Sequence, residues 1–367
     1  MLRHRLMPVL GVTAALTLAA CGDDNNTGSA DSGSGSSESS LSGKLAGAGS
    51  SAQEAAQGAW IAGFQSANSG ATISYDPVGS GGGREQFVAG GVDFAGSDAA
   101  LKEDELAGAE KRCGGAENLI ELPAYVSPIA VIYNLEGVDG LQLDPATIAG
   151  IFLGKIKKWN DPAIAATNEG VTLPDTDIVP VHRSDDSGTT ENFTDYLHVA
   201  AKDVWTAEPD GEWPTKSGEA ADGTSGVVAA VKNGAGTIGY ADASQAGELG
   251  KAKVKVGDAY VEPTADAAAK ILEESKRTEG AASHVWTYTL NRTPDAADTY
   301  PVVLTSYLIG CTKYDDAAKA ELVKGYFNHV VSADGQSKAA ETAGSAPLTD
   351  TLRGQIQPSV DAIGSAS

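Results

Sequence analysis

Residues 178–197 place a polar turn between a short apolar strand and a helix. The strand is expected over residues 178–181 and the helix over residues 191–197, joined by the segment His-Arg-Ser-Asp-Asp-Ser-Gly-Thr-Thr at residues 182–190. Backbone N–H groups at the start of a helix have no partner within the helix, so they can bind an anion. This segment therefore predicts an anion site on a strand–turn–helix unit and favours an α/β fold.

The side chains of the same turn suit an anion. The planar guanidinium of Arg183 can bind two oxygens of a tetrahedral anion, and Ser187 and Thr189 offer neutral donors. Asp185 is the expected partner that holds the guanidinium in place. The alternative is ordinary capping, in which Ser187 caps its own helix and Arg183 is a solvated surface charge.

Three further strand-to-helix turns occur near the start of the chain, and they carry Ser51, Ser80 and Asp98. In open α/β sheets, the turns at the carboxyl ends of parallel strands converge on one crevice. The glycine string at residues 79–83 is expected to be a loop, with a plain flexible turn as the alternative. It is no dinucleotide fingerprint, because Arg84 takes the place of the third glycine, and no phosphate-binding loop of the Gly-x-x-x-x-Gly-Lys type occurs.

Later segments continue the alternation of strands and helices. Lysines 155, 157 and 158 are expected to form a solvated face rather than an anion patch. The expected strands are residues 126–133, 236–240 and 302–309, and the expected helices are residues 145–152, 226–232, 266–277, 317–331, 337–343 and 352–363.

Composition and charge narrow the function. A length of 367 residues allows two domains, and 41% hydrophobic residues provide a sizeable core. The net charge of -23 argues against binding to nucleic acid or to an anionic membrane surface, because either partner needs a basic face. A local arrangement of dipoles can still bind an anion. No motif indicates a cofactor, a metal site or a catalytic serine elbow.

The N-terminal residues are typical of an exported protein. Residues 1–20 contain basic residues, a short apolar run and a small-residue end, which predict a cleaved signal peptide. The string Leu-Ala-Ala-Cys at residues 18–21 resembles a bacterial lipobox, which implies a lipid on Cys21. Residues 21–44 are rich in Gly, Ser, Asp and Asn, so a flexible tether is expected.

Cys113 and Cys311 remain once Cys21 is set aside. In an exported protein, an even number of remaining cysteines most simply pair with one another, so a disulfide is expected. The alternative is two buried free thiols.

Several segments together resemble the phosphate-binding protein of the bacterial phosphate ABC transporter. They occur in the order of that family and cover nearly all of the chain beyond the tether. The segment from residue 151 and the arginine-containing turn are specific, whereas the glycine strings are not. The similar segments are GAGSS at 47–51, GSGGG at 79–83, VDFAGSDA at 92–99, IFLGKIKKWNDPAIA at 151–165, VHRSDDSGTT at 181–190, GTIGYAD at 236–242 and YPVVLTSYLI at 300–309.

The resemblance implies a two-lobed, periplasmic-binding-protein-like fold of type II, with an anion bound in the cleft between two α/β lobes. Lobe I is expected to comprise residues 45–125 and 301–367, and lobe II residues 126–300, joined by two crossover strands. Cys113 and Cys311 then fall in the same lobe. The implied partners are inorganic phosphate and the permease subunits of the transporter, with membrane attachment through the lipid on Cys21.

Carried over position by position, the resemblance assigns the ligand contacts to both lobes, with Asp185 paired to Arg183 behind them. Ser51 stands where Thr is common, and Asp186 stands where Gly is usual. Ala52 stands where an aromatic is common, so only its amide can serve. The implied contact residues are Ser51, the amide of Ala52, Ser80, Asp98, Arg183, Ser187, Gly188 and Thr189.

Asp98 is expected to set the specificity. Phosphate keeps a proton that it can donate to this carboxylate, whereas sulfate has none, so sulfate should be rejected and arsenate only slightly disfavoured. The alternatives are a binding protein for another oxyanion, such as sulfate or molybdate, a secreted phosphatase, and a lipoprotein that has lost its ligand.

Overall fold

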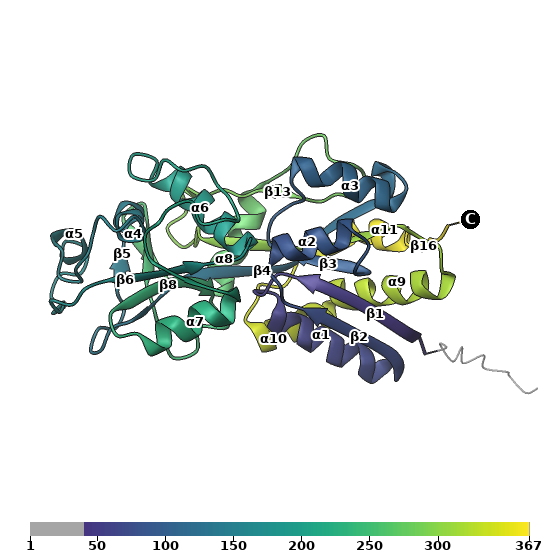
Figure 1. Ribbon diagram of the computed structural model, residues 1–367, viewed down its shortest axis with the longest axis horizontal. Coiled ribbons are helices and arrows are strands. Elements are labelled where there is room, and N and C mark those ends of the chain that lie inside the picture. Colours follow the sequence, from purple (N-terminus) through teal and green to yellow (C-terminus); the bar gives the residue numbers. More distant parts are fainter. Residues whose placement is uncertain (1–39, 367) are drawn as a thin grey trace, which may run out of the picture. The chain divides into compact units, whose positions relative to one another are not determined.

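The computed structural model describes residues 40–366 (Figure 1). The predicted signal peptide, Cys21 and most of the predicted tether lie outside the described residues, so the structure does not test them. The helices, in chain order, are α1 (Glu54–Ala67), α2 (Ser80–Val88), α3 (Glu103–Cys113), the 3₁₀ turn η1 (Ala116–Asn118), α4 (Pro145–Phe152), α5 (Pro162–Ala165), α6 (Gly188–Ala200), α7 (Gly223–Asn233), α8 (Ala265–Glu274), α9 (Ala317–Val331), α10 (Ala333–Ala343) and α11 (Asp350–Asp361).

The main sheet within residues 40–366 has nine strands. From one edge, the strands lie in the order β2 (Gly70–Asp76), β1 (Ser42–Gly49), β3 (Phe94–Ser97), β14 (Val303–Cys311), β4 (Leu119–Asn134), β8 (Thr237–Asp242), β6 (Val179–Arg183) and β7 (Glu219–Ala221), with β9 (Gly250–Lys251) also paired to β4. The smaller sheets join β5 (Gln142–Leu143) to β10 (Lys253–Val256) and β11 (Ala259–Val261), β12 (Lys276–Arg277) to β13 (Tyr288–Thr289), and β15 (Lys313–Tyr314) to β16 (Gly364–Ser365).

The long strand β4 joins two groups of strands. Its residues 119–128 pair with β14, behind which lie β3, β1 and β2, and this set is called the first strand group here. Its residues 129–134 pair with β8, next to β6 and β7, and these three strands form the second strand group. Figure 1 shows the two groups lying along different parts of β4.

Strand direction decides where the two groups meet. β3 is antiparallel to β14, which is antiparallel to β4, so β1, β2 and β3 run in the same direction as β4. β8 is antiparallel to β4, and β6 and β7 are parallel to β8. The carboxyl ends of β1, β2 and β3 therefore face those of β6, β7 and β8 across the middle of β4, where ligand sites of open α/β sheets form.

Most predicted elements occur where local signals are clear. Helix α4 spans the predicted residues 145–152, because Asp144 accepts a hydrogen bond from the N–H of Thr147 at 2.7 Å and Pro145 occupies the first turn. Strand β4 is buried along nearly its whole length, as its continuous apolar run predicts. Lysines 155, 157 and 158 are exposed, in agreement with the expected solvated face.

Several boundaries differ from prediction. The helix predicted over residues 266–277 ends at Glu274, and residues 276–277 form β12 instead. Strand β1 begins at Ser42, so the tether boundary predicted at residue 44 is too late, because backbone pairing of Ser42 with Gly70 needs no apolar side chain. The predicted loop at residues 79–83 is also wrong, since α2 begins at Ser80. A Cβ on Gly83 would lie 2.3 Å from the Cα of Gly49, so glycine is required for this close helix–strand contact rather than for a loop.

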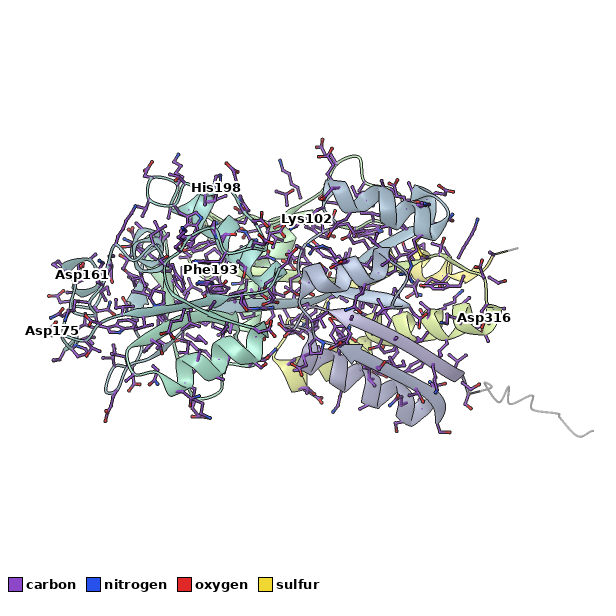
Figure 2. The ribbon with its side chains drawn as sticks, viewed as in Figure 1. Lys102, Asp161, Asp175, Phe193, His198 and Asp316 are labelled. Carbon is purple, nitrogen blue, oxygen red and sulfur yellow. A yellow bond between two sulfur atoms is a disulfide. The ribbon has the colours of Figure 1, made fainter. Side chains whose placement is uncertain are left out.

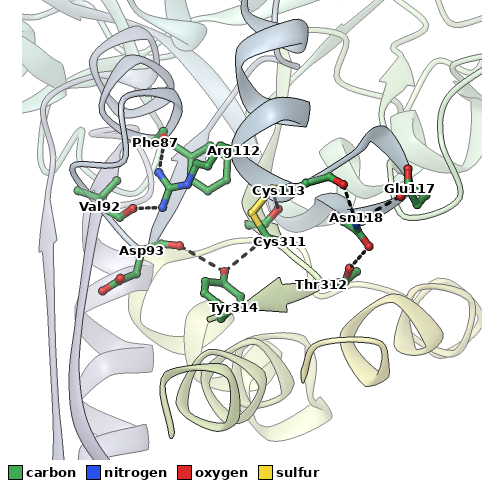
Figure 3. The surroundings of a disulfide bond; sticks show 12 residues. Phe87, Val92, Asp93, Arg112, Cys113, Glu117, Asn118, Cys311, Thr312 and Tyr314 are labelled. Carbon is green, nitrogen blue, oxygen red and sulfur yellow. Dashed lines mark hydrogen bonds between the residues drawn. A yellow bond between two sulfur atoms is a disulfide. The ribbon is translucent and has the colours of Figure 1, made fainter. Parts of the chain in front are cut away.

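The predicted disulfide between Cys113 and Cys311 is present (Figure 3), with 5.2 Å between the two Cα atoms. It joins the last residue of α3 to the last residue of β14 and is buried. Nearby, the Arg112 guanidinium lies 4.0 Å from the centre of the Phe87 ring. The disulfide therefore ties α3, the helix that follows β3, to β14, the strand of the first strand group that comes last in the sequence.

Replacing both cysteines with serine is expected to lower the free energy of unfolding by about 5 kcal/mol, because the disulfide closes a loop with a sequence separation of 198 residues. Urea unfolding measures the effect. Reducing agent should lower the unfolding midpoint of the wild type and leave that of the double variant unchanged. Equal midpoints for the two oxidised proteins would contradict the expectation.

Candidate functional site

Ser51, which follows β1, contacts the start of α7, the helix that follows β7 of the second strand group. Its hydroxyl lies 2.9 Å from Oγ1 of Thr224 and accepts a hydrogen bond from the Thr224 N–H at 3.0 Å. Both residues are buried. The turn after β1 therefore meets a helix start across the sheet.

Asp98, which follows β3, contacts the start of α6. Its Oδ2 accepts a hydrogen bond from the Thr189 hydroxyl at 2.9 Å, and its N–H donates to the hydroxyl of Ser80 at 3.1 Å. A Cβ on Gly188 would lie 2.7 Å from the Ser80 Oγ, so only glycine allows this approach. Ser80, Asp98, Gly188 and Thr189 are thus brought together, as predicted.

Arg183 ends β6 and is held by Asp185. The guanidinium Nε donates to Asp185 Oδ1 at 2.7 Å, and its Nη2 donates to Oδ2. A further nitrogen, Nη1, lies 3.4 Å from Thr224 Oγ1, which links Arg183 to Ser51. Arg183 is only 2% exposed, so it is not the solvated surface charge of the alternative interpretation.

The electrostatics of this ion pair favour a charged Asp185. Burial raises the pKa of the carboxyl, but the hydrogen bond and charge of Arg183 outweigh burial, so the pKa lies below its ordinary value. The N–H of Gly223 adds a hydrogen bond to Asp185 Oδ1 at 3.2 Å. The guanidinium is therefore fixed in one orientation, which suits binding of an anion through its other edge.

Ser187 caps its own helix, which is one of the two roles considered for it. Its Oγ accepts a hydrogen bond from the Thr190 N–H at 3.2 Å, so it caps α6. A hydroxyl that accepts one hydrogen bond can still donate its own hydrogen. Capping and donation to an anion are therefore compatible at this position.

Ala52, whose amide is predicted to contact the ligand, is buried and hydrogen-bonded within its own turn. Its N–H donates to the hydroxyl of Ser50 at 3.1 Å, so the amide already has an acceptor within its own turn. Its methyl group is fully buried in the main core. The structure gives Ala52 a packing role and does not test contact with a ligand.

The carboxylate of Asp186 faces two cationic side chains from the helical segments that follow strands of the first strand group. Its Oδ2 lies 3.3 Å from Nζ of Lys102, which precedes α3 (Figure 2), and 3.6 Å from Nη2 of Arg84 on α2. Burial lowers the pKa of Lys102, but the charges of Asp186 and Asp210 outweigh burial, so the pKa lies above its ordinary value. Asp186 therefore forms an ionic contact between the two strand groups.

Sequence reasoning missed three residues of this cluster. Thr224 begins α7 and contacts both Ser51 and Arg183, and Asp222-Gly223 just before it is a helix-start signal that could have revealed it. Asn192 donates to the backbone oxygens of Asp98 and Gly188. Ser306 donates to Asp98 Oδ1 at 2.6 Å, but nothing in its apolar strand sequence marks it.

Metal and membrane signals can be checked for the described residues only. Within residues 40–366, no group of three or more His, Cys, Asp or Glu side chains is arranged to hold a metal ion. Across the same residues, no helix is both long and apolar enough to cross a membrane. The candidate site consists of the buried polar residues at the strand ends, among them Arg183 and Asp98.

An α/β fold with donors on two facing strand groups is typical of solute-binding proteins. A family model described as a PBP superfamily domain matches residues 34–334. The chain is 37% identical over 370 residues to phosphate-binding protein PstS 3 of Mycobacterium tuberculosis, covering 98% of this chain and 99% of that protein. It is 33% identical to phosphate-binding protein PstS of Pasteurella multocida, covering 81% and 84%. The chain therefore belongs to the PstS family of phosphate-binding proteins, as its motifs predict.

Solved structures share the fold. A phosphate-binding protein from Stenotrophomonas maltophilia matches with a TM-score of 0.68 at 21% identity, covering 86% of this chain and 94% of that one. A periplasmic phosphate-binding protein solved with bound phosphate also has a TM-score of 0.68, at 22% identity, covering 86% and 93%. These matches confirm the predicted α/β binding-protein fold. The relatives are named as binding proteins, in agreement with the expectation that the chain is not an enzyme.

Replacing Asp185 with Asn is expected to lower the free energy of unfolding by about 2 kcal/mol at neutral pH, because Arg183 stays buried without its counter-charge. The folded pKa of Asp185 lies below its ordinary value of 3.8. The ion pair therefore stabilises the protein above pH 3.8, and its contribution is lost as the pH falls through the folded pKa.

Urea unfolding at pH 7 and at decreasing pH measures this difference, with the exposed Asp175→Asn as the matched control. A difference between wild type and Asp185→Asn that stays constant down to the acid limit of folding would show that the ion pair is not its source.

Proposed function

We propose that this protein captures inorganic phosphate outside the cytoplasm, between two lobes, and delivers it to an ABC importer. The observation that supports this most strongly is the burial of Arg183 and Asp98, at 2% and 3% exposure, in two sets of hydrogen bonds that each reach a residue beside the other strand group. A fixed cation, several neutral donors and one acceptor suit an oxyanion that carries a proton. Membership of the PstS family supports phosphate as that anion.

The lobes proposed for this function are residues 45–125 with 301–367, and residues 126–300. The first strand group belongs to lobe I except for residues 42–44 of β1 and the part of β4 beyond residue 125, and the second strand group belongs to lobe II. Contacts of Ser51 with Thr224 and of Asp98 with Thr189 cross between them. A ligand that contacts both lobes binds best when they meet, so it shifts an open-to-closed equilibrium toward the closed form.

The proposed phosphate contacts are Arg183, the hydroxyls of Ser51, Ser80, Ser187 and Thr189, the N–H groups at the start of α6 that include Gly188, and the Asp98 carboxylate. The amide of Ala52 is kept as a weaker candidate, because Ser50 already accepts its hydrogen bond. A lipid on Cys21 and the tether beyond it would hold the closed protein near the permease subunits in the membrane.

Asp98 is proposed to select for a protonated oxyanion. A carboxylate can only accept hydrogen bonds, and phosphate at neutral pH has a hydroxyl that can donate one. Sulfate has none, so it would place negative oxygens against the buried carboxylate. A site that requires a donor can reject a ligand without one by roughly 10⁴-fold. Arsenate has the same protons as phosphate and should be rejected only slightly.

Replacing Arg183 with Ala is expected to reduce phosphate affinity by at least about a hundredfold, because two charge-assisted hydrogen bonds to the anion are lost. Titration calorimetry with the phosphate-free protein measures the affinity, and thermal unfolding verifies folding. Arg353→Ala is the matched control: Arg353 is a partly buried residue on α11 that pairs with Asp350, and this variant should bind as the wild type does. Wild-type affinity in Arg183→Ala would overturn the site assignment.

Replacing Asp98 with Asn is expected to reduce the preference for phosphate over sulfate by at least about a hundredfold, because the amide can donate to an anion that has no proton. Parallel titrations with phosphate, sulfate and arsenate measure the ratios. An unchanged phosphate-to-sulfate ratio would contradict the role of Asp98, whereas wild-type binding of sulfate or molybdate in place of phosphate would overturn the function.

A further inference from the structure

A buried chain of hydrogen bonds leads from α9 to Asp98. The Tyr326 hydroxyl donates to Gln57 Oε1 at 2.6 Å, and Gln57 Nε2 donates to Gln53 Oε1 at 2.7 Å. Gln53 Nε2 donates to the Ser306 hydroxyl, which donates to Asp98 Oδ1 at 2.6 Å. These four neutral residues are at most 1% exposed. The chain is thus isolated from water and ends on the proposed specificity group.

One backbone carbonyl sets the direction of all the hydrogen bonds in this series. Gln53 Nε2 also lies 3.3 Å from the carbonyl oxygen of Tyr307, which can only accept a hydrogen bond. The amide nitrogen of Gln53 must therefore face Tyr307 and Ser306, and its oxygen must face Gln57. Gln57 then has to present its nitrogen to Gln53 and its oxygen to Tyr326.

Both ends of the chain agree with this direction. Burial raises the pKa of Tyr326, so its hydroxyl keeps the hydrogen that it donates to Gln57. The Ser306 hydroxyl accepts from Gln53, so its own hydrogen is available for Asp98 Oδ1. The hydrogen bonds in such a directed chain polarise one another, and they are strongest when every donor and acceptor in it has a partner.

We propose that Ser306 and Gln53, oriented by the Tyr307 carbonyl, are positioning residues that hold Asp98 as a hydrogen-bond acceptor and so set the selectivity for an oxyanion carrying a proton. This inference rests on the proposed function. Ser306 occupies Oδ1, and Oδ2 faces Thr189 at the start of α6, where the anion is proposed to bind. The acceptor oxygen for the anion is thereby the one that points toward α6.

Loss of the Ser306 hydroxyl would release this constraint. Asp98 could then rotate and turn Oδ2 away from the hydroxyl of phosphate. This rotation weakens phosphate binding and lowers the preference for phosphate over sulfate, whereas a purely structural role of Ser306 predicts no change in that preference. The phosphate-to-sulfate affinity ratio is therefore the informative measurement.

The test compares the full chain with Ser306→Ala and Gln53→Leu by titration calorimetry with phosphate and with sulfate. Ser306→Ala is expected to lower phosphate affinity by about tenfold or more, and to lower the phosphate-to-sulfate ratio by at least about tenfold, because a charge-assisted hydrogen bond is lost. Gln53→Leu leaves both Ser306 and Asp98 intact and should lower the ratio by about threefold to tenfold.

Thr305→Val is the matched control, since Thr305 adjoins Ser306 on β14 and its buried hydroxyl has no hydrogen-bond partner among the described residues. Thermal unfolding shows which variants fold. The control should keep the wild-type affinities and ratio.

Three results would overturn the inference: an unchanged ratio in the folded variants, a loss of phosphate affinity with an unchanged ratio, or an equal shift in Thr305→Val. The same titrations distinguish failure of this inference from failure of the proposed function. If Asp98→Asn shifts the ratio and Ser306→Ala does not, the inference alone fails. If the wild type binds no phosphate, or Asp98→Asn leaves the ratio unchanged, the assignment beneath it fails.

Discussion

The site depends on the opposite directions in which two groups of strands run along β4. β1 and β3 run in the same direction as β4, whereas β6 and β8 run in the opposite direction. The carboxyl ends of these four strands therefore face the same region. Each strand end feeds a turn and most feed a helix start, so backbone N–H groups and small hydroxyl side chains converge there. A single parallel sheet of the same sequence segments would place these turns along one edge instead of opposite one another.

Burial gives the few charges at this junction their effect. A buried guanidinium needs a partner, and Asp185 supplies it, which holds Arg183 in one orientation. Asp98 is buried among neutral donors, including Thr189 and Ser306. The net charge of -23 does not prevent anion binding, because solvent and salt screen distant surface charges while the nearby dipoles are fixed.

The departures from the family pattern have structural explanations. Asp186, which stands where glycine is usual, pairs with Lys102 and Arg84 across the two strand groups. Its negative charge is therefore partly neutralised beside the site. Ala52 fills a buried position in the core where an aromatic ring is common, and Ser50 accepts the hydrogen bond of its amide.

Much of the fold followed from local patterns. Strand β4 has a continuous apolar run and helix α4 has an Asp-Pro start. These are strong local signals, and both elements were predicted from them. The helical conformation of residues 81–83 was missed, because the contacts that require glycine there are tertiary. Gly83 lies against Gly49 of β1 and Gly81 against Asp186, both far away in sequence and without a local signal.

The sequence by itself determined the alternation of strands and helices, the family, and the residue types available for an anion, because these depend on neighbours in the chain and on recognisable motifs. Only the tertiary structure decided that Thr224 joins Ser51 and Arg183, that Asp186 faces Lys102, and that Ser306 lies behind Asp98. Their partners lie tens to hundreds of residues apart, so their meeting follows from strand order and helix packing rather than from any local pattern.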